Sequence, residues 1–300
     1  MSETALLVMA YGTPAGPEAI EPYYTHIRRG LPPPQDLLEE LTARYAAIGG
    51  SSPLLEITRA QAAGLARRVP ETTAFVGQKH APPFIEDAVA DIVASGIDRA
   101  CGVVLAPHYS TMSIEQYKTR ARNAFEEQGW DGHFDFVDSW HLERGFITFL
   151  AQRVREAIDE LPPAARAEAV VLFTAHSLPE RILTTGDPYP SQLRETAEAV
   201  AAEAGLTRWD IAWQSAGRTK DPWIGPDILD VIDGLARDGV PGAVICPCGF
   251  VADHLEVLYD VDIEAAGRAE VAGIHLVRTS SPNDDPVFLD ALAAAVARAT

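Results

Sequence analysis

Cysteine is scarce in this sequence, which holds only Cys101, Cys246 and Cys248 among its 300 residues. Three thiols cannot build the disulfide framework of a small secreted protein, and they fit a reducing cytoplasm. A structural zinc or iron–sulfur site usually takes four ligands, and Cys101 is the only thiol besides the Cys246-Pro247-Cys248 pair. We therefore interpret Cys246 and Cys248 as small apolar residues near a strand end.

Basic residues are also in short supply, because 24 lysines and arginines stand against 43 acidic residues, a formal net charge of −19. A chain this acidic repels phosphate backbones and anionic lipid surfaces. Nucleic acid is therefore excluded as an expected partner. The excess of acid serves mainly to keep the protein in solution.

Long apolar runs are absent, and no segment approaches the roughly 20 residues that a membrane-spanning helix needs. The chain starts Met1-Ser2-Glu3-Thr4 without a basic stretch, and the apolar run at 5–10 is too short for a secretory signal. We expect a cytoplasmic protein without membrane insertion. With 47% hydrophobic residues, it can form one large or two medium domains.

Short apolar strands alternate with longer amphipathic stretches, which predicts an α/β fold with parallel sheets covered on both faces. Four strands precede the Pro162-Pro163 break and four follow it, as two similar halves would produce. We predict domains at 1–160 and 161–300, the second closed by a C-terminal helix at 285–300. The expected strands are 5–10, 73–77, 102–106, 134–137, 170–174, 211–214, 243–246 and 274–277, and the expected helices are 57–69, 85–95, 114–127, 146–161 and 191–204.

The candidate site residues share one position relative to these strands. Tyr11, His108, His176 and Gly249 each follow a predicted strand directly. Open α/β sheets bind their ligands at the carboxyl ends of the strands. We therefore expect these residues to meet in one place.

His176 follows the apolar run at 170–174 and precedes Ser177. Its imidazole can accept a proton or bind a metal near neutral pH. A histidine at a strand end can equally be a hydrogen-bonding support residue, and its position alone does not decide between the two. Nearby, Gly186-Asp187-Pro188-Tyr189 is typical of an ordered turn that supports the loop.

Three acids at four-residue steps, Glu256, Asp260 and Glu264, would lie on nearly one face of an α-helix. Like charges at this spacing cost about 0.2–0.5 kcal/mol per pair. The usual explanation is a solvated face, but apolar residues such as Leu258 and Ile263 are interleaved with these acids, which favours a function. With His176, the acids could bind a transient divalent ion such as Fe²⁺ and pass ions or protons along the row.

The few basic residues cluster between the first two predicted strands, at Arg28, Arg29 and Arg44. Arginine pairs bidentately with carboxylates, so an anionic ligand with carboxylate arms would suit this region. The alternative is pairing with Glu39 or Glu40 in surface ion pairs. Tyr11, considered alone, is more typical of a packing residue with a satisfied hydroxyl group.

Taken together, these segments resemble the ferrochelatase family, in particular the soluble bacterial type assigned to coproporphyrin III. The resemblance covers essentially the whole chain. Its matching segments are 6–14, 23–30, 44–54, 79–88, 105–110, 175–179, 186–190, 221–226 and 249–260. It implies two Rossmann-like domains with four-stranded parallel sheets, chelatase-like, and a porphyrin cleft between them. It also implies insertion of Fe²⁺ into a free-base porphyrin in haem biosynthesis, with release of two protons.

The resemblance also implies roles for individual residues of this sequence. His176 and Glu256 match the pair at the metal, Tyr11 matches the tyrosine axial to the iron of the product, and Asp260 and Glu264 match the outer acids of an ion or proton path. The positions that match porphyrin contacts are Tyr11, Arg28, Arg44, Tyr45, Ser52 and Tyr117.

Departures from some relatives refine this hypothesis. The cysteines of a C-terminal [2Fe–2S] cluster are missing, so we expect no cluster and no cofactor, with Fe²⁺ as a substrate only. An apolar docking extension is not evident near 52–57, which favours coproporphyrin III, with four propionates, over protoporphyrin IX, with two. A protoporphyrin IX ferrochelatase, a chelatase for cobalt or another tetrapyrrole, and a haem carrier without catalysis are the alternatives. The next enzyme of the haem pathway is a possible transient partner.

Overall fold

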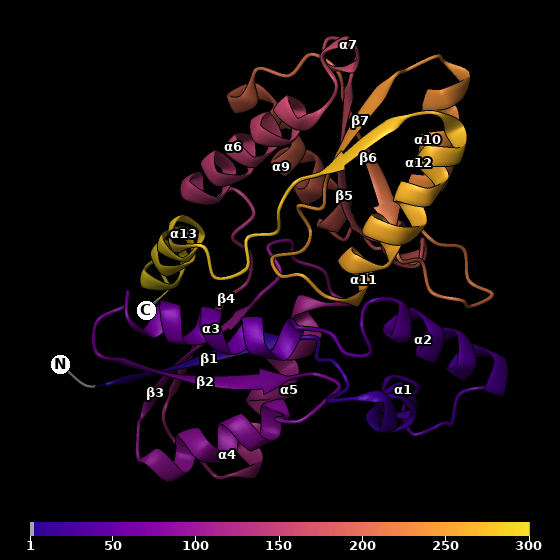
Figure 1. Cartoon of the computed structure of the whole chain (residues 1–300). Coiled ribbons are helices and arrows are strands. Elements are labelled where there is room, and N and C mark those ends of the chain that lie inside the picture. The colour runs from indigo at the N-terminus through magenta and orange to yellow at the C-terminus, as the bar shows by residue number, and fades with distance from the viewer. Residues whose placement is uncertain (1–2, 300) are drawn as a thin grey trace.

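The chain forms two four-stranded sheets in which every strand pairs in parallel with its neighbours (Figure 1). The computed structural model describes residues 3–299. The strand orders are β2-β1-β3-β4 and β6-β5-β7-β8, so the second sheet repeats the topology of the first. The strands are β1 Thr4–Ala10, β2 Thr72–Gln78, β3 Arg99–Val104, β4 His133–Val137, β5 Val170–His176, β6 Trp209–Gln214, β7 Gly242–Cys246 and β8 His275–Arg278.

The central strands are apolar on both faces because helices cover both sides of each sheet. In β1, Leu6 and Val8 pack into one buried cluster, whereas Leu7 and Met9 pack into another on the opposite face. This arrangement explains why the parallel strands read as continuous apolar runs rather than as alternating patterns. The predicted α/β class and the two sheets are confirmed.

The helices connect the strands and cover the sheets. In the first half they are α1 Ile20–Ile27, α2 Gln35–Ala47, α3 Leu54–Ala66, α4 Ile85–Ser95, α5 Ile114–Glu127 and α6 Arg144–Glu160, after a 3₁₀ turn at Pro17–Ala19. In the second half they are α7 Pro163–Arg166, α8 Arg181–Thr184, α9 Tyr189–Ala204, α10 Ile228–Arg237, α11 Leu255–Leu258, the π-helix η2 Asp260–Ala265, α12 Ala266–Ala272 and α13 Pro286–Ala297. Helices α4 and α5 have the predicted bounds.

Two helices join the halves. α6 precedes the predicted boundary at residue 160, yet it packs against α9, β7 and β8 of the second half. The C-terminal helix α13 packs against α6 and α3, which returns the chain to the first half (Figure 1). As a result, one buried cluster runs from Leu6 and Leu65 to Phe173 and Phe288 without interruption.

The third strand begins and ends earlier in the chain than predicted. β3 begins at Arg99, paired with His133, and ends at Val104 instead of covering 102–106. Leu105 and Ala106 are apolar for another reason, since they line the central cavity described below. Apolar character at a ligand site was thus mistaken for strand character.

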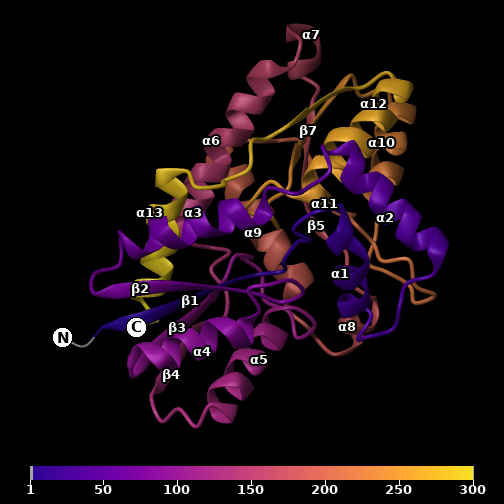
Figure 2. The same ribbon diagram turned by 60° about the horizontal axis from the view of Figure 1, so that its bottom comes forward.

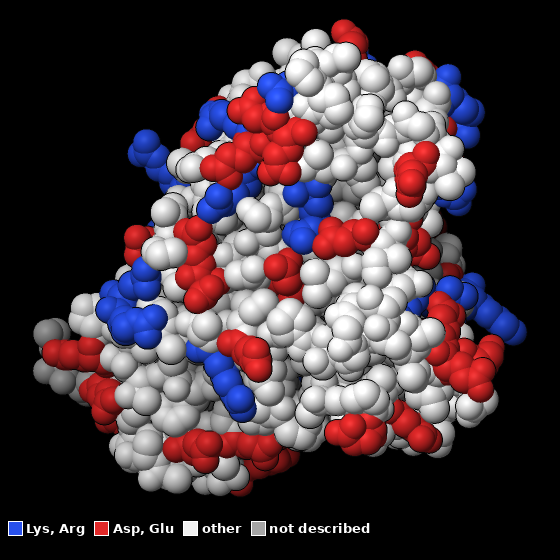
Figure 3. Space-filling view, in the orientation of Figure 1, with Lys and Arg blue, Asp and Glu red and all other residues white. Residues whose placement is uncertain are grey.

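Helices α1 and α2, two of the three between β1 and β2, lie next to α11 of the second half in Figures 1 and 2. Figure 3 shows acidic side chains gathered along the lower edge of one face, in the region of α4, and over α6. In the part of the chain that the structure describes, no helix combines the length and the hydropathy of a transmembrane segment.

Candidate functional site

A cavity of about 890 Å³ lies where the carboxyl ends of the two sheets face each other. Loops after β1, β2 and β3 contribute Tyr11, Lys79 and His108 from the first half. The end of β5 and the loop after β7 contribute His176 and Phe250 from the second half. The volume falls in the range of about 300–1,000 Å³ that is common for small-molecule and cofactor sites.

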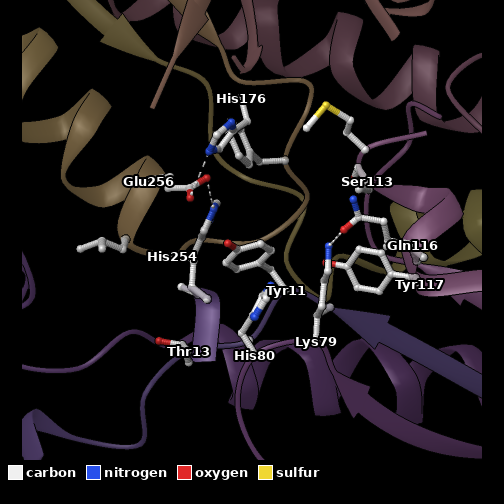
Figure 4. A pocket seen from close by; sticks show the side chains of 18 of the residues that line it. Tyr11, Thr13, Lys79, His80, Ser113, Gln116, Tyr117, His176, His254 and Glu256 are labelled. Carbon is white, nitrogen blue, oxygen red and sulfur yellow. Dashed lines mark hydrogen bonds and ion pairs between the residues drawn. The ribbon is translucent and has the colours of Figure 1, made fainter. Parts of the chain in front are cut away.

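His176 is the last residue of β5, and Figure 4 shows its ring pointing into the cavity. Its Nδ1 atom contacts the backbone carbonyl of Ser177. A carbonyl only accepts hydrogen bonds, so Nδ1 is the donor in this contact and Nε2 is the nitrogen that is left to face the cavity. Nε2 lies 3.6 Å from Oε1 of Glu256, so His176 presents a ring nitrogen beside a carboxylate.

Glu256 stands in the first turn of α11, opposite His176 (Figure 4). Its backbone carbonyl accepts a hydrogen bond of 2.7 Å from Nε2 of Gln214, at the end of β6. Burial raises the pKa of Glu256, but the charge of His176 and the contact with His254 outweigh burial, so the net pKa is lowered. Glu256 is therefore held as a carboxylate in a sheltered site.

The sequence did not predict His254 as a site residue, although it contacts Glu256. Its Nε2 atom is 3.6 Å from Oε2 of Glu256, and its Nδ1 atom is 2.8 Å from the carbonyl oxygen of Ala252. Burial lowers the pKa of His254, but the contact with Glu256 outweighs it and the net pKa is raised. Glu256 is thus flanked by two imidazoles, His176 on one side and His254 on the other (Figure 4).

The prediction of one α-helical face for Glu256, Asp260 and Glu264 was wrong. The α-helix ends at Leu258, and a π-helix follows in which the amide of Glu264 bonds to the carbonyl of Tyr259 at 2.9 Å. Since the wider π-helix changes the direction of the side chains, Asp260 is turned inward and is 5% exposed, while Glu264 faces solvent. π-Bulges occur frequently at functional sites.

Asp260 is held by neighbours from both halves. Its Oδ1 atom accepts a hydrogen bond of 3.0 Å from Nη1 of Arg44, and its Oδ2 atom accepts one of 2.5 Å from Oγ of Ser215. Burial raises the pKa of Asp260 to about 6, and the nearby charge of Glu256 adds to this effect. Asp260 is therefore a carboxyl group that can change its charge near neutral pH.

Six of the predicted site residues line the same cavity: Tyr11, Tyr45, Ser52, Tyr117, His176 and Glu256. Tyr11 lines the cavity and is 41% exposed as a residue, and its ring centroid lies 4.6 Å from that of His80. Burial and the charge of Glu256 raise the pKa of Tyr11, so its hydroxyl stays protonated in the ligand-free protein. Tyr45 is buried and its hydroxyl lies 3.3 Å from Oγ1 of Thr13.

The two predicted arginines, Arg28 and Arg44, do not line this cavity. Arg44 lines a smaller adjoining pocket of about 210 Å³, which also touches Tyr11 and Glu256. Its Nη2 atom pairs with Glu40 at 3.1 Å, in addition to the bond with Asp260. Arg28 is not among the cavity-lining residues, whereas its neighbour Arg29 is. Arg44 thus forms the expected ion pair with Glu40 and a second, unexpected one with the buried Asp260.

Lys79 and His80 were also missed, although they follow β2 at the position shared by the other candidates. Lys79 donates a hydrogen bond of 2.7 Å to Oε1 of Gln116 and lies 5.0 Å from the ring of Tyr117 (Figure 4). Burial lowers the pKa of Lys79 to about 8 and that of His80 to about 3. The rule that located Tyr11 and His176 would have found both residues.

Within residues 3–299, no group of three or more His, Cys, Asp or Glu side chains is arranged to hold a metal ion. His176 offers one ring nitrogen and Glu256 one carboxylate, and borderline divalent ions accept this mixture of donors. The remaining ligands would have to come from a bound molecule or from water.

The sequence profile of the ferrochelatase family matches residues 3–300 of this chain. The chain belongs to the ferrochelatase family. It is 48% identical over 298 residues to the coproporphyrin III ferrochelatase of Geobacillus thermodenitrificans, covering 97% of this chain and 94% of that protein. It is 46% identical to the protein of the same name from Bacillus subtilis, covering 97% and 96%. The resemblance found in the sequence is confirmed, and the chain is a metal chelatase of the lyase class.

Solved structures show the same fold in more distant chelatases. SirB from Bacillus subtilis, determined with Fe³⁺, superposes with a TM-score of 0.63 at 12% identity and covers 99% of this chain and 95% of its own. The sirohydrochlorin chelatase SirB from Bacillus subtilis subspecies spizizenii, in complex with cobalt, gives a TM-score of 0.60 at 9% identity, with the same coverage. The two-sheet architecture is therefore that of the chelatases.

Proposed function

We propose that this chain is a coproporphyrin III ferrochelatase, which inserts Fe²⁺ into coproporphyrin III and releases two protons to give the iron coproporphyrin of haem biosynthesis. The single observation that carries the proposal is the pairing of His176 and Glu256 from the second half in a cavity to which the first half contributes Tyr11. Family membership and the names of the relatives support the choice of reaction.

The chemistry requires two pyrrole N–H protons to leave while a hydrated cation loses water. The Nε2 atom of His176 and the carboxylate of Glu256 are the acceptors for protons and the donors for iron on one face of the ring. We propose that Tyr11, which the first half contributes to the cavity, faces the other side of the ring, where its oxygen binds the iron of the product. Binding energy from the periphery must bend the flat ring so that its nitrogen lone pairs become accessible.

The periphery of the cavity suits an anionic macrocycle. Arg29 and Arg181 line it on opposite halves, with Ser52 and Tyr45 as uncharged donors. Arg28 and Arg44 lie nearby, and we propose that they turn toward propionates when the ring binds. Four propionates engage such a rim more fully than two, which supports coproporphyrin III over protoporphyrin IX.

Iron is the substrate in this proposal, and we propose that the enzyme uses no cofactor. A [2Fe–2S] cluster needs four ligands as a rule. The three cysteines are buried, with Cys101 in the first sheet and the other two at the end of β7 in the second. We also propose a cytoplasmic enzyme with neither nucleic acid nor membrane as partner, which passes its product to the next enzyme of the pathway by transient contact.

The test is an anaerobic assay on the purified full-length chain. Initial rates of Fe²⁺ insertion are compared for coproporphyrin III and protoporphyrin IX without detergent. We expect insertion into both, with a clear preference for coproporphyrin III. A preference for protoporphyrin IX would overturn the substrate assignment, and tight haem binding without any insertion would replace the enzyme with a carrier.

A further inference from the structure

Tyr189 connects α9 to the site through its hydroxyl group. Its OH donates a hydrogen bond of 2.9 Å to the backbone carbonyl of His176, the last residue of β5. At this point the chain leaves the sheet, so the carbonyl of His176 has lost the regular partner that a strand interior would provide. The tyrosine hydroxyl supplies that partner and fixes the peptide from which the imidazole projects.

Asp187 holds the start of the helix that carries Tyr189. Its Oδ1 atom accepts a hydrogen bond of 3.0 Å from the backbone N–H of Tyr189. Its Oδ2 atom accepts three more, from Oγ of Ser110 at 3.0 Å, from the N–H of Thr111 at 2.8 Å and from Oγ1 of Thr111 at 2.6 Å. The side chain is almost fully buried, since the residue is 9% exposed.

A carboxyl group suits this arrangement, because four donors converge on two oxygens and both oxygens of a carboxyl group can accept hydrogen bonds. An asparagine would replace one oxygen with an NH₂ group that points at N–H and O–H donors. Asp187 therefore has both oxygens fully engaged at this turn.

The contacts of Asp187 join the two walls of the cavity. Ser110 and Thr111 belong to the first half and lead into α5, whose residues Gln116 and Tyr117 line the cavity. Tyr189 and His176 belong to the second half. Through Tyr189, one carboxyl group therefore links the start of α5 to the backbone of His176, and both elements contribute residues to the cavity.

We propose that Asp187 and Tyr189 are positioning residues that set the distance and orientation of His176 relative to the bound macrocycle. This inference rests on the proposed function, because it assigns the two residues to the reaction of that site. Neither residue transfers a proton or binds iron in this account. They act through the carbonyl of His176 and through the loop that precedes α5.

The test compares Tyr189→Phe with the matched control Tyr109→Phe. Both changes delete one hydroxyl group that makes one hydrogen bond. The hydroxyl of Tyr109 bonds to Glu115 at 3.0 Å, within the first half and without contact to His176. Insertion kinetics, macrocycle affinity and the ¹⁵N NMR signals of the His176 ring are measured for each variant, with His176→Ala used to assign those signals.

We expect Tyr189→Phe to lower kcat for iron insertion roughly 10-fold, the lower end of the range for groups that orient a ligand residue. The macrocycle Kd should stay within about 3-fold, since no propionate contact is lost. The ring signals of His176 should shift in Tyr189→Phe and remain unchanged in Tyr109→Phe. Asp187→Asn should show the same pattern with a larger loss of kcat, roughly 100-fold.

Unchanged His176 signals and kcat in Tyr189→Phe would overturn the proposal, and so would equal losses in Tyr109→Phe. If Asp187→Asn does not fold, the tyrosine pair still decides the question. The NMR readout needs no iron insertion. A wild-type protein that fails to insert iron would defeat the proposed function, while the ring signals would still report whether Tyr189 positions His176.

Discussion

His254 sets the charge of Glu256 together with His176, because each imidazole lies 3.6 Å from one carboxylate oxygen. Replacing His254 by glutamine removes a partner that lowers the pKa of Glu256. The pKa of that carboxyl should therefore rise, and the acid limb of the pH profile of kcat/KM for iron insertion should move to higher pH. Rates measured across the acidic range check this shift.

His275→Gln is the control for this change, since His275 is an exposed residue at the start of β8. Its pH profile should match that of the wild type. An acid limb that moves to lower pH in His254→Gln, or does not move, would contradict the role assigned to His254.

Asp260 makes the stability of the protein depend on pH. Burial raises its pKa in the folded protein to about 6, above its ordinary value of 3.8. A raised acid pKa means that the folded state binds the proton more tightly. The contribution of Asp260 is therefore most favourable below pH 4 and is lost as pH rises through about 6.

Asp260→Asn should remove this dependence. Relative to the wild type, the variant should gain on the order of 2 kcal/mol of unfolding free energy between pH 4 and pH 7. Urea unfolding at both pH values measures the difference. A relative loss over the same interval would show that Arg44 and Ser215 hold Asp260 as a carboxylate more strongly than burial disfavours it.

The sequence located some of these residues and not others, for a physical reason. Tyr11, His176 and Glu256 could be found because strand ends and a matched family pattern point to them. His254 lies within the same matched segment, 249–260, but its role depends on a ring orientation that only the folded loop defines. The contact between Arg44 and Asp260 joins residues 216 positions apart, and no local pattern encodes it.

At the scale of elements, the loop after β7 is pressed against the end of β5. A Cβ atom on Gly249 would lie 2.5 Å from Cβ of Ala175 and 2.8 Å from its Cα atom, next to His176. Gly249→Ala should therefore force the two segments apart, at a cost of about 1–3 kcal/mol. It should also lower the insertion rate, because Glu256 and His176 lie on the separated segments.

Gly267→Ala is the matched control, because a Cβ atom there meets nothing within 4 Å and the residue lies in α12. This change should stabilise the protein by about 0.5–1 kcal/mol and leave the insertion rate unchanged. Thermal unfolding and initial rates check both variants. Equal behaviour of the two alanine variants would show that the contact at Gly249 does not constrain the site.

The π-helix shows where element prediction fails. A single extra residue in a turn changes which side chains face inward. The four-residue spacing of Glu256, Asp260 and Glu264 is also the spacing of an α-helix, so the sequence alone does not reveal the π-helix. By contrast, α4 and α5 were predicted with their observed bounds, because a regular apolar face encodes them. A regular apolar pattern in the sequence predicts a regular helix, whereas no such pattern predicts a local π-helix at a functional site.

At the scale of the whole molecule, the two halves share one buried cluster through α6 and α13. Leu289 of α13 packs against Gly64 of α3, where a Cβ atom would lie 2.4 Å from its Cδ1 atom. Leu289→Ala should destabilise the protein by about 2–5 kcal/mol. Both halves should still unfold in one transition, measured by calorimetry and by circular dichroism.

Two separated transitions in that variant would show that the halves are independent and that α13 alone joins them.

The alternation of strands and helices predicted two sheets of four strands, and the structure has them. It could not predict that α6 crosses to the second sheet or that α13 returns to the first half. Those placements depend on contacts between surfaces that are distant in sequence.

The central claim is that His176 accepts protons from, or delivers iron to, a macrocycle held between the two sheets. The most direct measurement is the rate of Fe²⁺ insertion by His176→Ala, beside its affinity for coproporphyrin III. The account predicts a loss of at least roughly 100-fold in rate, with macrocycle binding retained. Near-normal turnover by this variant would contradict it.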